Sequence, residues 1–166
     1  MTMNAERRGF TLVELIVVIL LIGILVAFGV PQYMRAMENN KAEDAASMTN
    51  MIGTANRMYA LYHSGNLASG TLSSSCSGNC AQDYTACDLV RCKYVAAMDF
   101  DKYAYAISVG GSCGGGVAAC AARRTSGSNS TTTSPYSTWG YSVTTTGQMN
   151  MIPCSGSSSC PPTPTQ

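Results

Sequence analysis

Histidine is almost missing from this chain of 166 residues, since His63 is the only one. A metal or catalytic site that needs several histidines is therefore excluded. No carboxylate pair stands in a context typical of catalysis, so we expect no enzymatic activity, no catalytic residue, no metal and no cofactor. A basic excess is also lacking: ten Lys and Arg against nine Asp and Glu give a formal net charge of +1. This balance does not indicate nucleic acid as a partner.

Cysteine is missing from the first 75 residues, although the chain has eight cysteines in all. An even number confined to one part of a chain predicts disulfides formed in an oxidising compartment. Zinc is the alternative for the first four, but their spacing only partly fits the paired Cys-x2-4-Cys units of zinc sites. The disulfide candidates are Cys76, Cys80, Cys87, Cys92, Cys113, Cys120, Cys154 and Cys160.

Spacing suggests two of the disulfide pairs. Cys154 and Cys160 enclose only residues 155–159, so we expect them to pair with each other. Cys113 and Cys120 flank a glycine-rich turn, and we expect a disulfide across it. Partners for the remaining four stay open, because eight cysteines allow 105 pairings in principle.

Long apolar runs, in contrast, are present. A nearly unbroken one extends from Leu12 to Val30, just after Arg7 and Arg8. A helix of about 20 such residues crosses the hydrocarbon core of a bilayer, and the arginines are expected to stay on the cytoplasmic side. The run contains one charge, Glu14. A charge in hydrocarbon is costly unless it is paired, so the partner of Glu14 is the central question.

Three interpretations of this start compete. An ordinary secretory signal peptide would use the small residues in 25–29 as its cleavage region. A twin-arginine export signal fits residues 7–12 loosely. Both leave Glu14 unexplained. In the third interpretation, the sequence Arg-Arg-Gly-Phe-Thr-Leu-Val-Glu-Leu at residues 7–15 closely resembles the processing site of type IV pilins and type II secretion pseudopilins.

The resemblance, close over residues 7 to about 33, implies a specific maturation. A prepilin peptidase would cleave between Gly9 and Phe10 and methylate the new amino group of Phe10. Glu14 falls at the position of the family's glutamate, which implies an assembly role in which it pairs with Phe10 of a neighbouring subunit. Gly23 and Pro31 also lie where many of these pilins have a helix-loosening glycine and a proline.

The family layout divides the chain into four parts. They are a leader at residues 1–9, a transmembrane and filament-core helix at 10–31, an amphipathic continuation at 32–63 and a disulfide-rich globular head at 64–166. The expected fold is α+β, of the type IV pilin kind: a long kinked amino-terminal helix packed against an antiparallel sheet of about four strands.

The helical pattern supports one element from about Phe10 to about Tyr62, roughly 80 Å long. Gly23, Gly29 and Pro31 are expected to kink it, since proline removes a helical hydrogen bond. Gly65 supplies the stop. The predicted apolar side, interrupted by Lys41, consists of Met34, Met37, Ala45, Met48, Ile52, Ala55, Tyr59 and Tyr62, and the predicted polar side of Arg35, Glu38, Asn39, Glu43, Asp44, Ser47, Asn50, Thr54 and Arg57.

The remaining chain predicts strands separated by turns. Residues 67–92 have no sustained period and are expected to form an irregular loop. Alternation of large and small residues predicts strands at 103–109 and 139–144, with a return strand at 117–123 and a short one at 149–152. Short connections between consecutive strands indicate an antiparallel sheet.

A structural protein is the function these features favour. The resemblance implies a pilus-like filament subunit that is held in the bacterial inner membrane as a single-pass protein and is extracellular after assembly. Its expected partners are further copies of itself or other pilins, the prepilin peptidase, the inner-membrane assembly machinery and the lipid bilayer. A type II secretion pseudopilin, and a minor or tip pilin with an adhesion or DNA-uptake role, are the alternatives.

Overall fold

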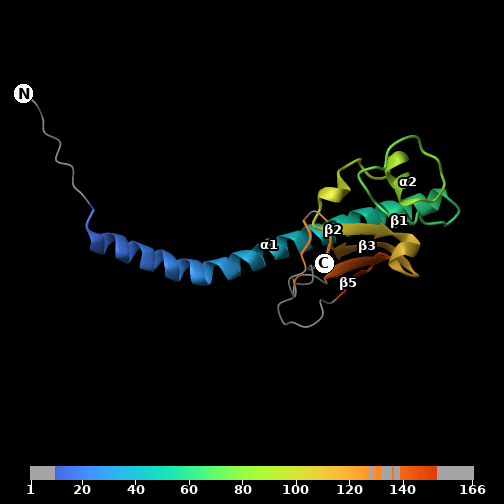
Figure 1. Ribbon diagram of the computed structural model, residues 1–166. Coiled ribbons are helices and arrows are strands. Elements are labelled where there is room, and N and C mark those ends of the chain that lie inside the picture. The colour runs from blue at the N-terminus through green and yellow to red at the C-terminus, as the bar shows by residue number, and fades with distance from the viewer. Residues whose placement is uncertain (1–9, 128, 132–135, 137–138, 153–166) are drawn as a thin grey trace, which may run out of the picture. The chain divides into compact units, whose positions relative to one another are not determined.

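The computed structural model describes residues 10–127, 129–131, 136 and 139–152. These residues form an α+β structure with one long helix and one antiparallel sheet (Figure 1). The chain divides into two compact units, residues 1–37 and 38–166, and each is described by itself below.

The long helix α1 is assigned over Leu12–Tyr62, within two residues of the prediction at each end. It continues through Gly23, Gly29 and Pro31 without a break in the assignment, and the bend expected there stays a prediction. Gly65 has a φ of 84°, and its N–H donates to the carbonyl of Ala60 at 2.8 Å. The positive φ closes the last turn, as the sequence predicted.

In the second unit, α1 buries most of the predicted apolar side together with one residue of the predicted polar side. Ala45, Ile52, Ala55 and Tyr59 are buried as expected, but Glu38, assigned to the polar side, is buried as well. The reason is the sheet, whose inner face already carries large aromatic side chains, so the helix fits against it mainly through small residues. The buried residues of α1 are Glu38, Ala42, Ala45, Ala46, Thr49, Ile52, Gly53, Ala55, Asn56 and Tyr59, whereas Met34, Met37, Met51, Met58 and Tyr62 are exposed.

Gly53 shows how close this approach is. A Cβ added there would lie 3.1 Å from both Cβ and Cγ1 of Val143 on the sheet. Asn56, three residues on, donates from Nδ2 to the carbonyls of Ala68 at 3.1 Å and Ala118 at 2.8 Å, and accepts from the Ala68 N–H at 2.9 Å. A buried amide with all these bonds joins helix, loop and sheet without an unsatisfied polar group.

The sheet has five strands in the order β1-β2-β3-β4-β5, and every neighbouring pair is antiparallel. Four strands were predicted and are present. The fifth, β1, has only two residues, too few for a period to show. The strands are β1 (Gly70–Thr71), β2 (Tyr105–Val109), β3 (Val117–Arg123), β4 (Gly140–Thr144) and β5 (Met149–Ile152).

The loop expected over residues 67–92 contains a short helix, α2 (Ala86–Arg91), which the sequence did not reveal. Two 3-10 turns were missed as well, η1 (Phe100–Lys102) and η2 (Gly110–Cys113). Leu89 and Val90 of α2 are buried and join the core beneath the loop. Short helices in a Ser-, Gly- and Cys-rich segment are set by these tertiary contacts rather than by local propensity.

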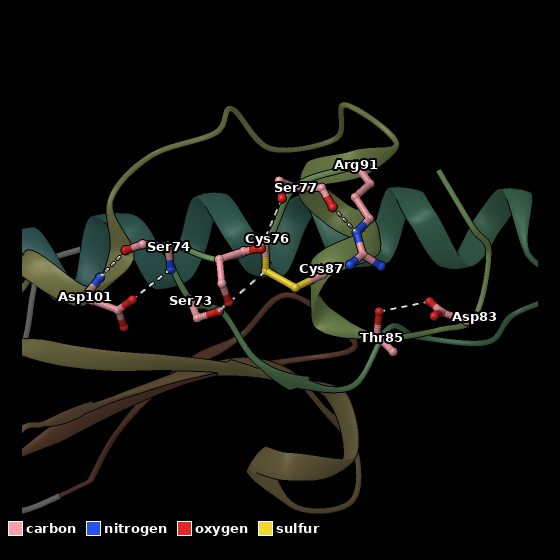
Figure 2. The surroundings of a disulfide bond; sticks show 10 residues. Ser73, Ser74, Cys76, Ser77, Asp83, Thr85, Cys87, Arg91 and Asp101 are labelled. Atoms are coloured by element: carbon pink, nitrogen blue, oxygen red, sulfur yellow. Dashed lines mark hydrogen bonds between the residues drawn. A yellow bond between two sulfur atoms is a disulfide. The ribbon is translucent and has the colours of Figure 1, made fainter. Parts of the chain in front are cut away.

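Disulfides hold this loop in place. Cys76 pairs with Cys87, and Cys80 pairs with Cys92, so the cysteines considered for zinc are oxidised. Figure 2 shows the first of these bonds beside Arg91, whose Nε donates to the carbonyl of Ser77 at 2.9 Å. A third disulfide joins Cys113 to Cys120 across the glycine-rich turn. The pairing expected for Cys154 and Cys160 lies outside the described residues.

Candidate functional site: the amino-terminal helix

Every described residue from 10 to 37 is exposed, including the large aliphatic side chains of the apolar run. This part of α1 is long and apolar enough to cross a membrane by length and composition. Leaving so much apolar surface in water is unfavourable, since burial stabilises by about 25 cal/mol per Å². The segment is therefore suited to contact with lipid or with other apolar helices.

Phe10 and Thr11 precede the first helical residue, and the Phe10 side chain is 82% exposed. Gly9, the other residue of the predicted cleavage site, lies outside the described residues. Processing at the Gly9–Phe10 bond stays a prediction.

Thr11 and Glu14 form a reciprocal cap on the start of α1. Glu14 Oε2 accepts from the Thr11 backbone N–H and from the Thr11 hydroxyl, both at 2.9 Å. In return, the Glu14 N–H donates to Thr11 Oγ1 at 3.3 Å. This is the capping-box arrangement, in which the first and fourth residues of a Thr-x-x-Glu segment satisfy each other's backbone donors.

The cap supplies one partner for the Glu14 carboxylate. Its carboxylate has a partner within its own chain, and that partner is Thr11, which sequence reasoning missed. The Thr-x-x-Glu spacing directly before an apolar helical run was the signal that could have found it. No described residue donates to the second oxygen, Oε1. One oxygen of Glu14 thus stabilises the helix start, while the other is free for an external donor.

Gly23 and Gly29 have no atoms within 4 Å of an added Cβ, so neither glycine is required by packing inside the described chain. Pro31 lies inside the helix and lacks the N–H that would bond the Ala27 carbonyl. These residues lower the helical stability of the segment by about 1 kcal/mol for a glycine and more for the proline. Their role as a kink stays a prediction.

A second carboxylate, Glu38, is the polar centre of the second unit. Its Oε1 accepts from Arg123 Nε at 2.6 Å and from Trp139 Nε1 at 3.1 Å, and its Oε2 accepts from Lys41 Nζ at 3.1 Å. The Arg123 guanidinium also donates to the carbonyls of Ala104 and Asn129. The network joins α1 to β3 and to the residue before β4, so it fixes the helix on the sheet.

The protonation of Glu38 follows from these contacts. Burial alone would raise the pKa of Glu38, but the hydrogen bonds from Arg123, Trp139 and Lys41 outweigh it, and the pKa lies below the ordinary value of 4.5. Arg123 and Glu38 are 2% and 7% exposed at their side chains, so the pair is removed from solvent. A buried carboxylate stays charged only when it is paired in this way.

The outer side of the same helix carries a shallow apolar groove of about 400 Å³. Met58 and Leu61 on α1 and Leu67 beyond it contribute most of the apolar lining, and Thr54, Arg57, Ala60, Gly65 and Thr145 complete it. Met58 and Leu61 are 50% and 83% exposed.

Comparisons with known proteins match only part of the chain. A family model of the prokaryotic N-terminal methylation motif matches residues 4–30. The type IV major pilin protein PilA of Myxococcus xanthus is 34% identical over 56 residues, which cover 34% of this chain and 26% of that protein. A type IV major fimbrial protein FimA of Dichelobacter nodosus is 38% identical over 53 residues, which cover 32% of this chain and 34% of that protein.

The chain thus spans about a quarter to a third of the length of the curated relatives it matches. No solved structure matches it. The methylation motif at residues 4–30, the pilin and fimbrial relatives, and the α+β fold with its long amino-terminal helix together support a type IV pilin.

Proposed function

We propose that this chain is a structural subunit of a type IV pilus-like filament. In this proposal it is held in the bacterial inner membrane by residues 10–31 and polymerises through the same segment. The observation that carries the proposal is an exposed apolar helix whose first turn contains a single carboxylate. The matched relatives, a major pilin and a major fimbrial protein, favour a pilus subunit over a secretion pseudopilin.

The first step is maturation. Cleavage between Gly9 and Phe10 would leave Phe10 as the amino terminus, with Thr11 and Glu14 still able to cap the helix. The new amine is positively charged at neutral pH and lies at the same depth as Glu14, four residues away. N-methylation of Phe10 keeps that charge.

The second step is docking of a subunit onto the filament. Glu14 Oε2 is occupied by Thr11, and Oε1 accepts nothing from the described residues. We propose that Oε1 of an incoming subunit accepts from the Phe10 amine of a subunit already in the filament. Capping within the chain and pairing between chains then use different oxygens and do not compete.

The free-energy gain is large enough to set the register. A carboxylate at the centre of a membrane helix costs about 2.5–3.5 kcal/mol on insertion scales, which is an upper bound for Glu14 in the first turn of α1. Relief of that cost by an amine would favour docking by up to about two orders of magnitude. Apolar helices alone slide along one another with little preference, so the charge pair would also define the axial position.

Substitution of Glu14 by glutamine tests the proposal in a host with a compatible assembly system. Glu14→Gln keeps the size of the side chain and removes the charge. We expect normal loss of residues 1–9, normal methylation of Phe10 and normal membrane insertion, but few or no filaments in the sheared surface fraction. Mass spectrometry of the purified chain and electron microscopy of the sheared fraction provide the readouts.

Glu43→Gln is the matched control, because Glu43 is an exposed glutamate on the same helix outside the apolar run. It is expected to assemble like the parent. Filaments of Glu14→Gln in parental amounts would disprove the charge-pair mechanism. A mature chain that begins near Val30 would instead establish an ordinary signal peptide.

A further inference from the structure

The groove beside the last turns of α1 combines apolar side chains with a cation that the assembly proposal does not use. Met58 and Leu61 are exposed, and Leu67 is partly buried beside them. Arg57 lies over the turn between β4 and β5, since a Cβ added to Gly147 would lie 2.5 Å from Arg57 Nη1. Among the described residues, no carboxylate lies within 4 Å of the Arg57 guanidinium. The groove is therefore suited to an apolar side chain that is accompanied by a carboxylate.

An exposed carboxylate followed by an exposed aromatic ring is present elsewhere in the same unit. Asp83 is exposed, and Tyr84 is 42% exposed. Asp83 Oδ1 accepts from the Thr85 hydroxyl at 2.9 Å (Figure 2). No Lys, Arg or His side chain of the described residues lies within 4 Å of the Asp83 carboxylate. The segment Asp83–Tyr84 thus has the two groups to which the groove is suited.

Tyr84 is held in an uncommon backbone conformation. Its φ is 59°, a positive value that bulky residues rarely adopt. Its ring contacts the rings of Tyr59 and His63 edge-on, at centroid distances of 6.3 and 6.1 Å. The disulfide between Cys80 and Cys92 closes the loop that contains Tyr84. The ring is therefore positioned by its own chain, which lowers the entropic cost of binding a partner.

The groove and the Asp83–Tyr84 segment lie at opposite edges of the sheet. The Ser69 N–H, one residue before β1, donates to the Tyr84 carbonyl at 2.8 Å, which places the segment beside β1. Arg57 lies beside β5, over the turn that precedes it. The outer strands β1 and β5 are four inter-strand spacings apart, about 19 Å at about 4.8 Å each (Figure 1). Asp83 and Arg57 of one chain are thus too far apart to pair with each other.

We propose that the groove binds the Asp83–Tyr84 segment of a second copy of this chain, a contact that rests on the filament function proposed above. The Tyr84 ring packs on Met58 and Leu61, and Asp83 pairs with Arg57. Tyrosine and arginine are the residue types that contribute most to binding at protein interfaces. Because two different surfaces meet, each copy keeps a second surface for the next copy, and the contact extends an open helical assembly instead of closing a dimer.

Zero-length crosslinking of filaments tests this contact directly. Arg57→Lys keeps the positive charge and supplies an amine. A water-soluble carbodiimide condenses this amine with an adjacent carboxylate to an amide, and the carbodiimide takes up the water as a urea. Sheared filaments of Arg57→Lys are treated and separated on a reducing, denaturing gel. We expect dimers and larger products, and mass spectrometry of the dimer should identify an amide between residue 57 and Asp83.

The matched control for crosslinking is Arg57→Lys combined with Asp83→Asn. It retains the amine and removes the carboxylate, so this crosslink should be absent. Arg57→Lys combined with Asp99→Asn should retain the crosslink, because Asp99 is paired with Lys102 of its own chain at 2.8 Å.

The apolar part of the contact is tested by filament yield. Leu61 is 83% exposed, so Leu61→Ser should leave the fold of the unassembled chain intact. We expect it to lower the amount of sheared filaments by about fivefold or more. Met51→Ser is the control, because Met51 is an exposed residue of the same helix that does not line the groove, and its filament yield should equal that of the parent.

An exchange of charges tests the ionic part. Arg57→Asp and Asp83→Arg each bring like charges together and should each lower the filament yield, whereas the two substitutions combined should restore it. Restoration is not expected if either residue only supports the fold of its own chain. Single substitutions without effect, or a combined variant that stays defective, would contradict the pairing.

The contact and the filament proposal fail in different ways. Filaments of Arg57→Lys without a crosslink between residue 57 and Asp83 overturn the contact alone, as does equal assembly of Leu61→Ser and Met51→Ser. A parent chain that forms no filaments overturns the filament proposal and this contact with it.

Discussion

Glu14 and Glu38 lie on the same helix in opposite surroundings. Glu14 is exposed among aliphatic side chains and is held by one neighbour, Thr11. Glu38 is buried and receives hydrogen bonds from Arg123, Trp139 and Lys41. In the half of α1 that contains Glu38, the carboxylate is paired within the chain. In the half that contains Glu14, the apolar side chains are exposed, and no described residue donates to Glu14 Oε1.

The comparison explains the different residue types in the two halves. Large aliphatic residues surround Glu14, because they suit a surface that contacts lipid or other helices. Small residues such as Ala42, Ala45 and Gly53 line the buried side of the half that contains Glu38, because they allow the sheet to approach closely. The first part of α1 therefore has residues suited to contact with lipid or other helices, and the second part has residues suited to packing on the sheet.

The largest effect on stability is expected from removing the charge of Glu38. Glu38→Gln leaves the Arg123 guanidinium buried without a counter-charge, which typically costs about 3–5 kcal/mol. Glu14→Gln should change the unfolding free energy of the head by less than about 0.5 kcal/mol, as for surface positions. Urea unfolding followed by the fluorescence of Trp139, the single tryptophan, measures both. Equal effects of the two substitutions would remove the distinction between the halves.

Insertion of a large side chain should also destabilise the protein in one half of α1 and not in the other, with a smaller difference than for the two glutamates. Gly53→Leu places a side chain where even a Cβ would lie 3.1 Å from Val143, and such insertions typically cost about 1–3 kcal/mol. Gly23→Leu meets nothing within 4 Å and should not destabilise the unassembled chain. Tolerance of leucine at residue 53 without loss of stability would show that the helix is not held closely on the sheet.

The pH dependence of the unfolding free energy should also distinguish buried Glu38 from an exposed glutamate. The pKa of Glu38 is lowered in the folded chain, so Glu38 stabilises the head above its ordinary value of 4.5, and this contribution is lost as the pH falls below it. The stability difference between the parent and Glu38→Gln should therefore stay constant well above pH 4.5 and narrow as the pH falls through 4.5 toward the lowered pKa of Glu38. Glu43→Gln provides the control, and a difference that stays constant with pH would contradict the role assigned to Glu38.

The smallest effect is expected from the cap at the start of α1. Thr11→Ala removes the hydroxyl that Glu14 accepts from, and loss of a cap typically costs about 1 kcal/mol of helix stability. The amides of residues 12–14 should then exchange faster with solvent in detergent micelles, while those of the head keep their rates. Thr11→Ser retains the hydroxyl and should restore slow exchange; unchanged exchange in Thr11→Ala would show that the cap does not form.

Much of the fold could be predicted from the period of the sequence. Alternation predicted β2 and β4, the turns that follow them predicted β3 and β5, and the apolar run with Gly65 predicted both ends of α1. The two-residue β1 and the six-residue α2 are too short for a period, and tertiary contacts determine them.

The polar partners were harder to predict. Glu38 was assigned to the solvent side because its partner Arg123 is 85 residues away, and a helical pattern carries no information about a distant strand. Only the Thr11–Glu14 cap could have been predicted locally, from its spacing.

The short sequence separation of the disulfide partners has a consequence for how the head folds. The three bonds within the described residues join cysteines only 11, 12 and 7 residues apart. Each partner therefore meets the other within a loop that closes in well under a millisecond, before distant cysteines have become ordered. A thiol oxidase acting on the emerging chain would find the native partner nearby, so the head should need little disulfide reshuffling before the subunit is ready for use.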